Sequence, residues 1–250
     1  MIKTAFASSI GRVRETNQDF VKVFNNQNDI SMGIVCDGMG GHQGGDVAST
    51  MAVNHLGHAF KQTDFTDPHL AKKWLEVQLK LENETILNTA DRFSDLNGMG
   101  TTVVLAIAFA EKILVAHLGD SRAYIYGNND FKQITQDHSL VNELVKMGQI
   151  TVQEARNHPQ KNIITETLGV SSTVNPEFKT LEVHAGDIFL LCTDGLTNSL
   201  TDLQIQQILA TKNLTLKERC NKLINEANRL GGGDNITVCL ISYTEKEAEH

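Results

Sequence analysis

Apolar and polar positions form short runs that predict a protein built largely from strands. Runs that alternate, or that are apolar throughout, are typical of strands when turn residues bound them. Such runs occupy residues 2–7, 20–24, 30–36, 101–108, 113–117, 122–126, 131–134, 176–183, 188–193 and 236–243. The turns between residues 108 and 131 leave no room for crossover helices, so we expect these strands to be antiparallel.

Helical spacing of apolar residues occurs in two pairs of segments between these runs. The first pair is residues 47–60 and a long helix that starts at Asp67-Pro68 and ends before Gly98. Its apolar face is expected to contain Leu70, Trp74, Leu81 and Ile86-Leu87. The second pair is residues 203–209 and 215–230. The order of strands, two helices, strands, two helices and a strand predicts an α+β fold, in which two sheets stack and helices cover their outer faces.

Residues 137–168 interrupt this order. They contain a short helical pattern that Gly148 stops and a capping-box signature at Thr151-x-x-Glu154. We interpret this insert of small helices as a flap beside a site. Because no repeat, linker or low-complexity segment divides the chain, we assign residues 1–250 to a single domain with a frayed acidic tail at 245–250.

Composition narrows the class of protein. The formal charge of −8 argues against nucleic acid as the main partner, because phosphate backbones require clustered Lys and Arg. The four cysteines form no Cys-x-x-Cys pair and are interpreted as small buried apolar residues of a reducing compartment. Without a signal-peptide core or a membrane-length apolar run, the sequence predicts a cytoplasmic protein that does not insert into membranes.

The candidate chemistry lies in aspartates at the ends of strands. Asp37 and Asp194 each close an apolar run before a glycine, Asp234 lies in a glycine-rich turn, and Asp19 and Asp120 lie at similar junctions. Each alone is more often a plain turn residue. If they converge on one sheet edge, they repel one another unless divalent cations neutralise them.

A set of oxygen ligands without a Cys/His pattern favours Mg²⁺ or Mn²⁺ over zinc. Two such ions can activate a water and clamp a phosphoryl group. Gly38 and Gly40 have no Cβ to keep a main-chain carbonyl from an ion. His42 is either a general acid or a polar turn residue, and Arg14 is either a bidentate phosphate ligand or a solvated loop charge.

The motifs that carry these residues, taken in order, resemble those of the PPM/PP2C family of metal-dependent serine/threonine protein phosphatases, in its compact bacterial form. The resemblance runs from about residue 2 to residue 243. The motifs are Gly11-Arg-Val-Arg14-Glu-Thr-Asn17-Gln-Asp19, Asp37-Gly-Met-Gly-Gly-His42, Gly98-Met-Gly-Thr-Thr102, Gly119-Asp-Ser-Arg122, Thr193-Asp-Gly195 and Gly233-Asp-Asn-Ile-Thr237.

The resemblance implies a four-layer αββα sandwich with a dinuclear Mn²⁺ or Mg²⁺ centre. By motif position, Asp37 would bridge the two ions and the Gly38 carbonyl would bind one of them. Asp194 and Asp234 would complete the shell of the other ion. Asp19 would act in catalysis through metal-bound water.

Three further roles follow from the same resemblance. Some bacterial members hold a third ion, and Asp120 together with Asp194 matches that site. Arg14 would bind the substrate phosphate, and His42 falls at the position of the motif histidine. The chain departs from the common Ile-Thr-Arg-x-Leu-Gly stretch at Glu166, a change that affects flap docking or substrate preference rather than a metal ligand.

The implied activity is hydrolysis of phosphoserine and phosphothreonine in proteins by an activated water, with no covalent intermediate. The implied partners are a eukaryotic-like bacterial Ser/Thr kinase and its substrates, and the implied state is a monomer. A pseudoenzyme on this fold would have lost a ligand, whereas Asp37, Asp194 and Asp234 are all present. A phosphatase of small phospho-metabolites stays open, because the walls of the cleft decide substrate size.

Overall fold

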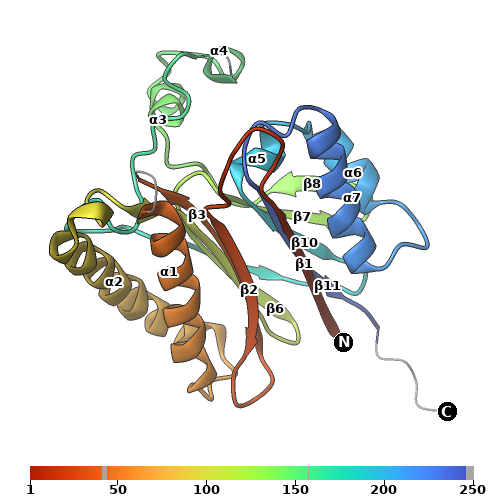
Figure 1. Cartoon of the computed structure of the whole chain (residues 1–250). Coiled ribbons are helices and arrows are strands. Elements are labelled where there is room, and N and C mark those ends of the chain that lie inside the picture. The colour runs from red at the N-terminus through yellow and green to blue at the C-terminus, as the bar shows by residue number, and fades with distance from the viewer. Residues whose placement is uncertain (41–43, 157, 246–250) are drawn as a thin grey trace.

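Two antiparallel β-sheets stack face to face, with helices on both outer faces (Figure 1). A computed structural model describes residues 1–40, 44–156 and 158–245. The six-stranded sheet consists of β2 (Asp19–Asn25), β3 (Ser31–Met39), β5 (Val103–Ala108), β6 (Lys112–Leu118) and β9 (Glu177–Glu182) in that order, with β4 (Gly100–Thr101) paired to β3. The five-stranded sheet consists of β1 (Ile2–Ser9), β11 (Ile236–Tyr243), β10 (Ile188–Cys192), β7 (Arg122–Gly127) and β8 (Asp130–Gln133) in that order.

The helices cover the sandwich in two pairs. The pair α1 (Gly44–Lys61) and α2 (Pro68–Arg92) packs on the six-stranded sheet, and the pair α6 (Asp202–Leu209) and α7 (Leu216–Arg229) packs on the five-stranded sheet (Figure 1). The short helices are η1 (Ser94–Leu96), α3 (Leu140–Lys146), α4 (Val152–Arg156) and α5 (Asp194–Thr197). The predicted sandwich with helices on both sides is therefore confirmed.

Three apolar layers hold the sandwich together. Two of these layers lie between a sheet and its helices. The third lies between the two sheets, where Val35 and Val104 of one sheet pack with Phe189 and Leu191 of the other. Both faces of the central strands are thus covered, which explains why β5, β10 and β11 are buried at every position and why β5 and β10 are apolar rather than alternating. All four cysteines are buried and unpaired, as predicted.

Helix boundaries follow the capping signals in the sequence. Asp67 caps α2 by accepting a hydrogen bond from the His69 amide, and Thr215 and Glu218 form a reciprocal capping box at α7. Within the described ranges, no helix is both long enough and apolar enough to cross a lipid bilayer.

The expected apolar face of α2 was partly wrong. Leu70 and Leu81 are 52% and 50% exposed, whereas Ala71, Leu75 and Leu79 are completely buried. These buried residues lie four apart, so they form a stripe that continues through the polar Glu82 and Asn83 to Ile86 and Ala90. Of the predicted face, Trp74 and Ile86 pack against the core as expected, whereas Leu70 and Leu81 lie one position away from the buried stripe.

Two strand ends also differ from the prediction. β3 continues through Asp37 to Met39, because Gly38 and Met39 pair with β4, and the chain turns at Gly40 with a φ of 123°. After β10 a single helical turn, α5, begins at Asp194, which the sequence pattern did not indicate. In Figure 1 the expected flap helices α3 and α4 extend away from the sandwich.

Candidate metal centre

Five aspartates meet where the two sheets come together, and both sheets contribute. Asp19 and Asp37 are register partners on β2 and β3 of the six-stranded sheet. Asp194 follows β10 and Asp234 precedes β11 in the five-stranded sheet, while Asp120 lies in the connection from β6 to β7 that passes between the sheets. The expectation of a single sheet edge was therefore wrong, although the expected convergence is present.

Burial and repulsion between neighbouring carboxylates make four of these groups costly to ionise: Asp19, Asp37, Asp120 and Asp194. Burial, with repulsion from Asp194 among the further causes, raises the pKa of Asp19 and that of Asp120 to about 7. Burial also raises the pKa of Asp37, and repulsion from Asp19, Asp194, Asp120 and Asp234 adds to the effect. The pKa of Asp194 is raised by burial and then by Asp234. A cluster with these properties favours a bound cation.

Hydroxyl side chains fix the carboxylate of Asp19 and the backbone of Asp37. Thr193 Oγ1 donates to Asp19 Oδ2 at 2.8 Å and accepts from the Thr237 amide at 3.0 Å, which links the two sheets. Thr102 Oγ1 accepts from the Asp37 amide at 3.0 Å and lies 2.7 Å from Ser121 Oγ. Thr102, Ser121, Thr193 and Thr237 all lie in the recognised motifs, but no role was predicted for them. For Ser121 and Thr193, the adjacent Asp120 and Asp194 were the available signal.

The donor atoms fit a hard divalent cation. In the described part of the chain, Asp19 Oδ1 is buried and has no hydrogen-bond partner, although buried polar atoms are almost always paired. The side chains that converge here offer only oxygen, which suits Mn²⁺ and Mg²⁺. The residues present therefore fit the predicted metal centre.

Gly38 is required for close backbone packing beside Asp37. A Cβ at this position would lie 1.9 Å from the Gly45 carbonyl oxygen and 2.7 Å from the Gln18 carbonyl oxygen. The Gly38 amide also donates to Gln18 at 3.1 Å. The start of α1 and the residue before β2 therefore pack directly on the Asp37-Gly38 backbone.

Arg14 lies at the mouth of the cluster and pairs with Asp234. Its Nε lies 2.8 Å from Oδ1 and its Nη2 donates to Oδ2 at 2.8 Å, so one edge of the guanidinium contacts both carboxylate oxygens. The side chain is 54% exposed. This geometry leaves Nη1 and one Nη2 hydrogen for another anion. The five aspartates and Arg14 are thus brought together as predicted, whereas His42 lies outside the described residues.

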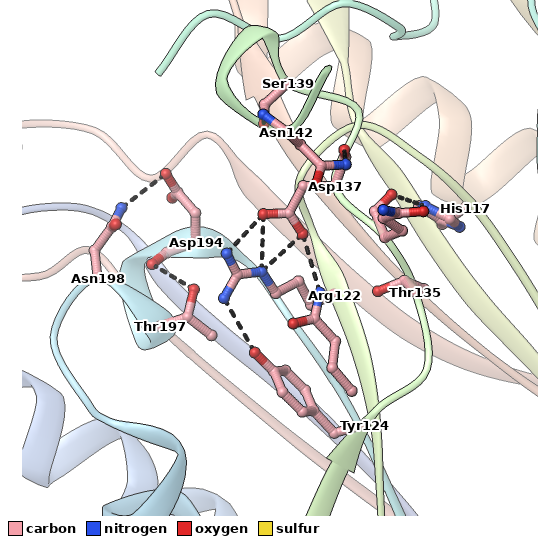
Figure 2. A network of polar contacts seen from close by, with 12 residues as sticks. His117, Arg122, Tyr124, Thr135, Asp137, Ser139, Asn142, Asp194, Thr197 and Asn198 are labelled. Atoms are coloured by element: carbon pink, nitrogen blue, oxygen red, sulfur yellow. Dashed lines mark hydrogen bonds and ion pairs between the residues drawn. The ribbon is translucent and has the colours of Figure 1, made fainter. Parts of the chain in front are cut away.

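A half-buried ion pair anchors the start of the flap beside Asp120. Figure 2 shows Arg122 of β7 between Asp137 and Tyr124. Arg122 Nε and Nη2 donate to the two Asp137 oxygens at 2.8 and 2.6 Å, and Nη1 donates to the Tyr124 hydroxyl at 3.1 Å. The side-chain Nδ2 of Asn142, in α3, donates to the main-chain carbonyl of Asp137 at 2.6 Å. Because Asp137 begins the flap, this network fixes its base.

A second group of metal-type side chains lies apart from the aspartates. Donor atoms of His117, His138 and Glu177 come within 4.8 Å of one another, the one such triple among the described residues. The His117 Nε2 is 2.9 Å from the Gln136 carbonyl, and His138 Nδ1 accepts from the Gly119 amide at 3.3 Å. An accepting Nδ1 places the His138 proton on Nε2, which faces Glu177 at 3.4 Å. We therefore interpret this group as a hydrogen-bonded brace at the flap base.

Comparison with known proteins agrees with this geometry. The sequence profile described as "Protein phosphatase 2C" matches residues 9–225. The serine/threonine phosphatase stp of Listeria welshimeri is 42% identical over 94% of this chain and 94% of its own.

Solved structures agree as well. The serine/threonine phosphatase of S. agalactiae has a TM-score of 0.94 and 40% identity, covering 98% of this chain and 100% of its own. The catalytic domain of the phosphatase PstP, solved with two manganese ions, has a TM-score of 0.85 and 33% identity, covering 98% of this chain and 99% of its own.

A four-layer sandwich with a carboxylate centre between its sheets defines a metal-dependent phosphatase of the αββα class. The matched profile and these relatives together show that the chain belongs to the protein phosphatase 2C family.

Proposed function

We propose that this protein hydrolyses phosphoserine and phosphothreonine in protein substrates at the aspartate centre. The observation that carries the proposal is the convergence of five mutually repelling carboxylates, one of which has a buried oxygen without a partner among the described residues. A bound pair of Mn²⁺ or Mg²⁺ ions supplies charge neutralisation and an activated water.

The residues of the chain have distinct roles in this proposal. Asp37 would hold both ions, the Gly38 carbonyl would hold one of them, and Asp194 and Asp234 would hold the other. Asp19 orients water through its free oxygen.

Three residues act outside this central pair. Asp120, together with Asp194, would hold a third ion. The free edge of the Arg14 guanidinium binds the substrate phosphate. His42 serves as a general acid for the leaving serine or threonine oxygen.

The test is phosphate release from a phosphothreonine peptide with Mn²⁺, with EDTA and with Asp194→Ala. We expect release that depends on Mn²⁺ and that both EDTA and the substitution abolish, while the exposed Asp91→Asn leaves it unchanged. No turnover, with Mn²⁺ still bound in calorimetry, would overturn the enzymatic proposal. Faster turnover of free phosphoserine than of the peptide would overturn the choice of protein substrates.

The setting of the activity is proposed from the same family membership. We infer a cytoplasmic monomer that opposes a eukaryotic-like bacterial Ser/Thr kinase by dephosphorylating the substrates of that kinase. Sedimentation of the purified protein tests the monomer, and phosphoproteomics of a deletion strain with and without the kinase gene tests the opposition.

A further inference from the structure

Asn235 holds together both ends of the loop that carries Arg14. Its Nδ2 donates to the Ile10 carbonyl and to the Thr16 carbonyl, each at 2.9 Å. Its Oδ1 accepts from the Gln18 amide at 2.8 Å. One buried side chain, 6% exposed, thus contacts the beginning, the end and the exit of this loop.

The amide group has a defined orientation because its contacts use both of its hydrogens and its oxygen. Rotating the amide by half a turn would place its NH₂ group against the Gln18 amide and its oxygen against two carbonyls. The tip of the loop has little support of its own, since Val13 is 68% exposed. The Arg12 amide adds one backbone bond, to Gly232 at 2.8 Å.

The same turn also contacts the tip of the loop. Asp234, the residue before Asn235, pairs with the Arg14 guanidinium. The main-chain N–H of Asn235 donates to Asp234 Oδ1 at 2.8 Å. The Asn235 side chain therefore fixes the backbone of the loop, and the Asp234 side chain fixes the guanidinium of Arg14.

We propose that Asn235 is a positioning residue for the reaction, which holds the Ile10–Gln18 loop so that Arg14 presents its free guanidinium edge to the substrate phosphate. The inference rests on the proposed function of Arg14. Asn235 has no contact with the phosphate in this proposal, and its effect passes through Arg14.

The expected result is a change in substrate binding rather than in turnover. If Asn235→Ala lets the loop hold Arg14 in its binding position about a tenth of the time, KM for a phosphothreonine peptide rises about tenfold. The Ki of inorganic phosphate rises by the same factor. We expect kcat and Mn²⁺ affinity, measured by calorimetry, to stay within about twofold, because the metal ligands keep their positions.

The decisive experiment is a double-mutant cycle with Arg14→Ala. If Asn235 acts through Arg14, Asn235→Ala changes KM less than about twofold once Arg14 is removed. The matched control is Asn228→Ala, which removes an amide that donates to Ser9 Oγ at 3.2 Å beside the same loop. We expect this control to leave KM unchanged.

The outcomes separate the proposals. No Mn²⁺-dependent turnover by the wild-type protein would reject the proposed function, and an unchanged KM in Arg14→Ala would reject the role of Arg14. An unchanged KM in Asn235→Ala, or the same rise in KM with and without Arg14, would overturn the inference.

If Asn235→Ala does not fold, Asn235→Asp takes its place. One carboxylate oxygen of this variant keeps the bond from the Gln18 amide, but the other replaces the NH₂ group and faces the Ile10 and Thr16 carbonyls. We therefore expect the same rise in KM and faster amide exchange at residues 12–16. An unchanged KM in this variant would also overturn the inference.

Discussion

Replacing Asp19 by Asn should stabilise the metal-free protein, although it removes a residue of the centre. Burial raises the pKa of this carboxyl from 3.8 to about 7, so the folded state binds its proton more tightly than the unfolded chain does. The cost of the carboxyl is therefore absent at low pH, and it grows as the pH rises from 3.8 towards 7.

These two pKa values give the magnitude. The carboxyl destabilises the fold by about 4 kcal/mol at pH 8, by about 2 kcal/mol at pH 5 and by almost nothing at pH 3. The amide keeps an oxygen to accept from Thr193 Oγ1, but its new NH₂ group is buried, and we allow about 1 kcal/mol for that cost. Asp19→Asn should then gain about 3 kcal/mol at pH 8 and about 1 kcal/mol at pH 5.

The assay is urea denaturation in EDTA at both pH values, with the exposed Asp91→Asn as a control for the change in charge. With Mn²⁺ added, the gain at pH 8 should shrink or reverse, because the wild-type carboxylate then contributes to metal binding. A gain equal at both pH values, or no gain in EDTA, would refute the argument from buried charge.

Three further measurements test other contacts. Asn83→Ala leaves the Gly169 amide and the Ser171 carbonyl without their partner, so the free energy of unfolding should fall by about 1–3 kcal/mol in urea; a smaller loss would mean that water replaces both bonds. Gly38→Ala forces a Cβ onto the Gly45 carbonyl, so both Tm and Mn²⁺ affinity in calorimetry should fall, and unchanged affinity would show that the centre tolerates the shift. Mn²⁺ should raise Tm more at pH 8 than at pH 5 in scanning calorimetry, because protons compete for the same carboxylates; an equal rise would exclude this competition.

The elements of the fold were predictable where one local signal decides them. The Asp67 and Thr215 caps and the apolar strands needed no knowledge of distant contacts. The buried face of α2 was mispredicted because a small residue, Ala71, faces the sheet while the larger Leu70 faces solvent. Which side of a helix is covered is set by tertiary packing, and size and hydrophobicity alone do not reveal it.

In the site, too, local sequence signals identified the residues, whereas tertiary packing decides their arrangement. The aspartates were recognisable from their place at strand ends, but their arrangement across two sheets depends on the strand order, in which β10 and β11 pair apart from β2 and β3. Asn235 contacts residues more than 200 positions away in the sequence: Ile10 lies 225 positions from it and Thr16 lies 219 positions from it. No local pattern contains such contacts.

The order of strands also sets when the centre can form during synthesis. In the five-stranded sheet β11 lies between β1 and β10, so β1 pairs with a strand that the ribosome makes more than 200 residues later. Until Asp234, Asn235 and β11 have emerged, the first strand and the Arg14 loop lack the partners they contact in the folded protein. A nascent chain therefore cannot assemble the complete centre before β11 is made, so catalytic competence requires translation through Tyr243.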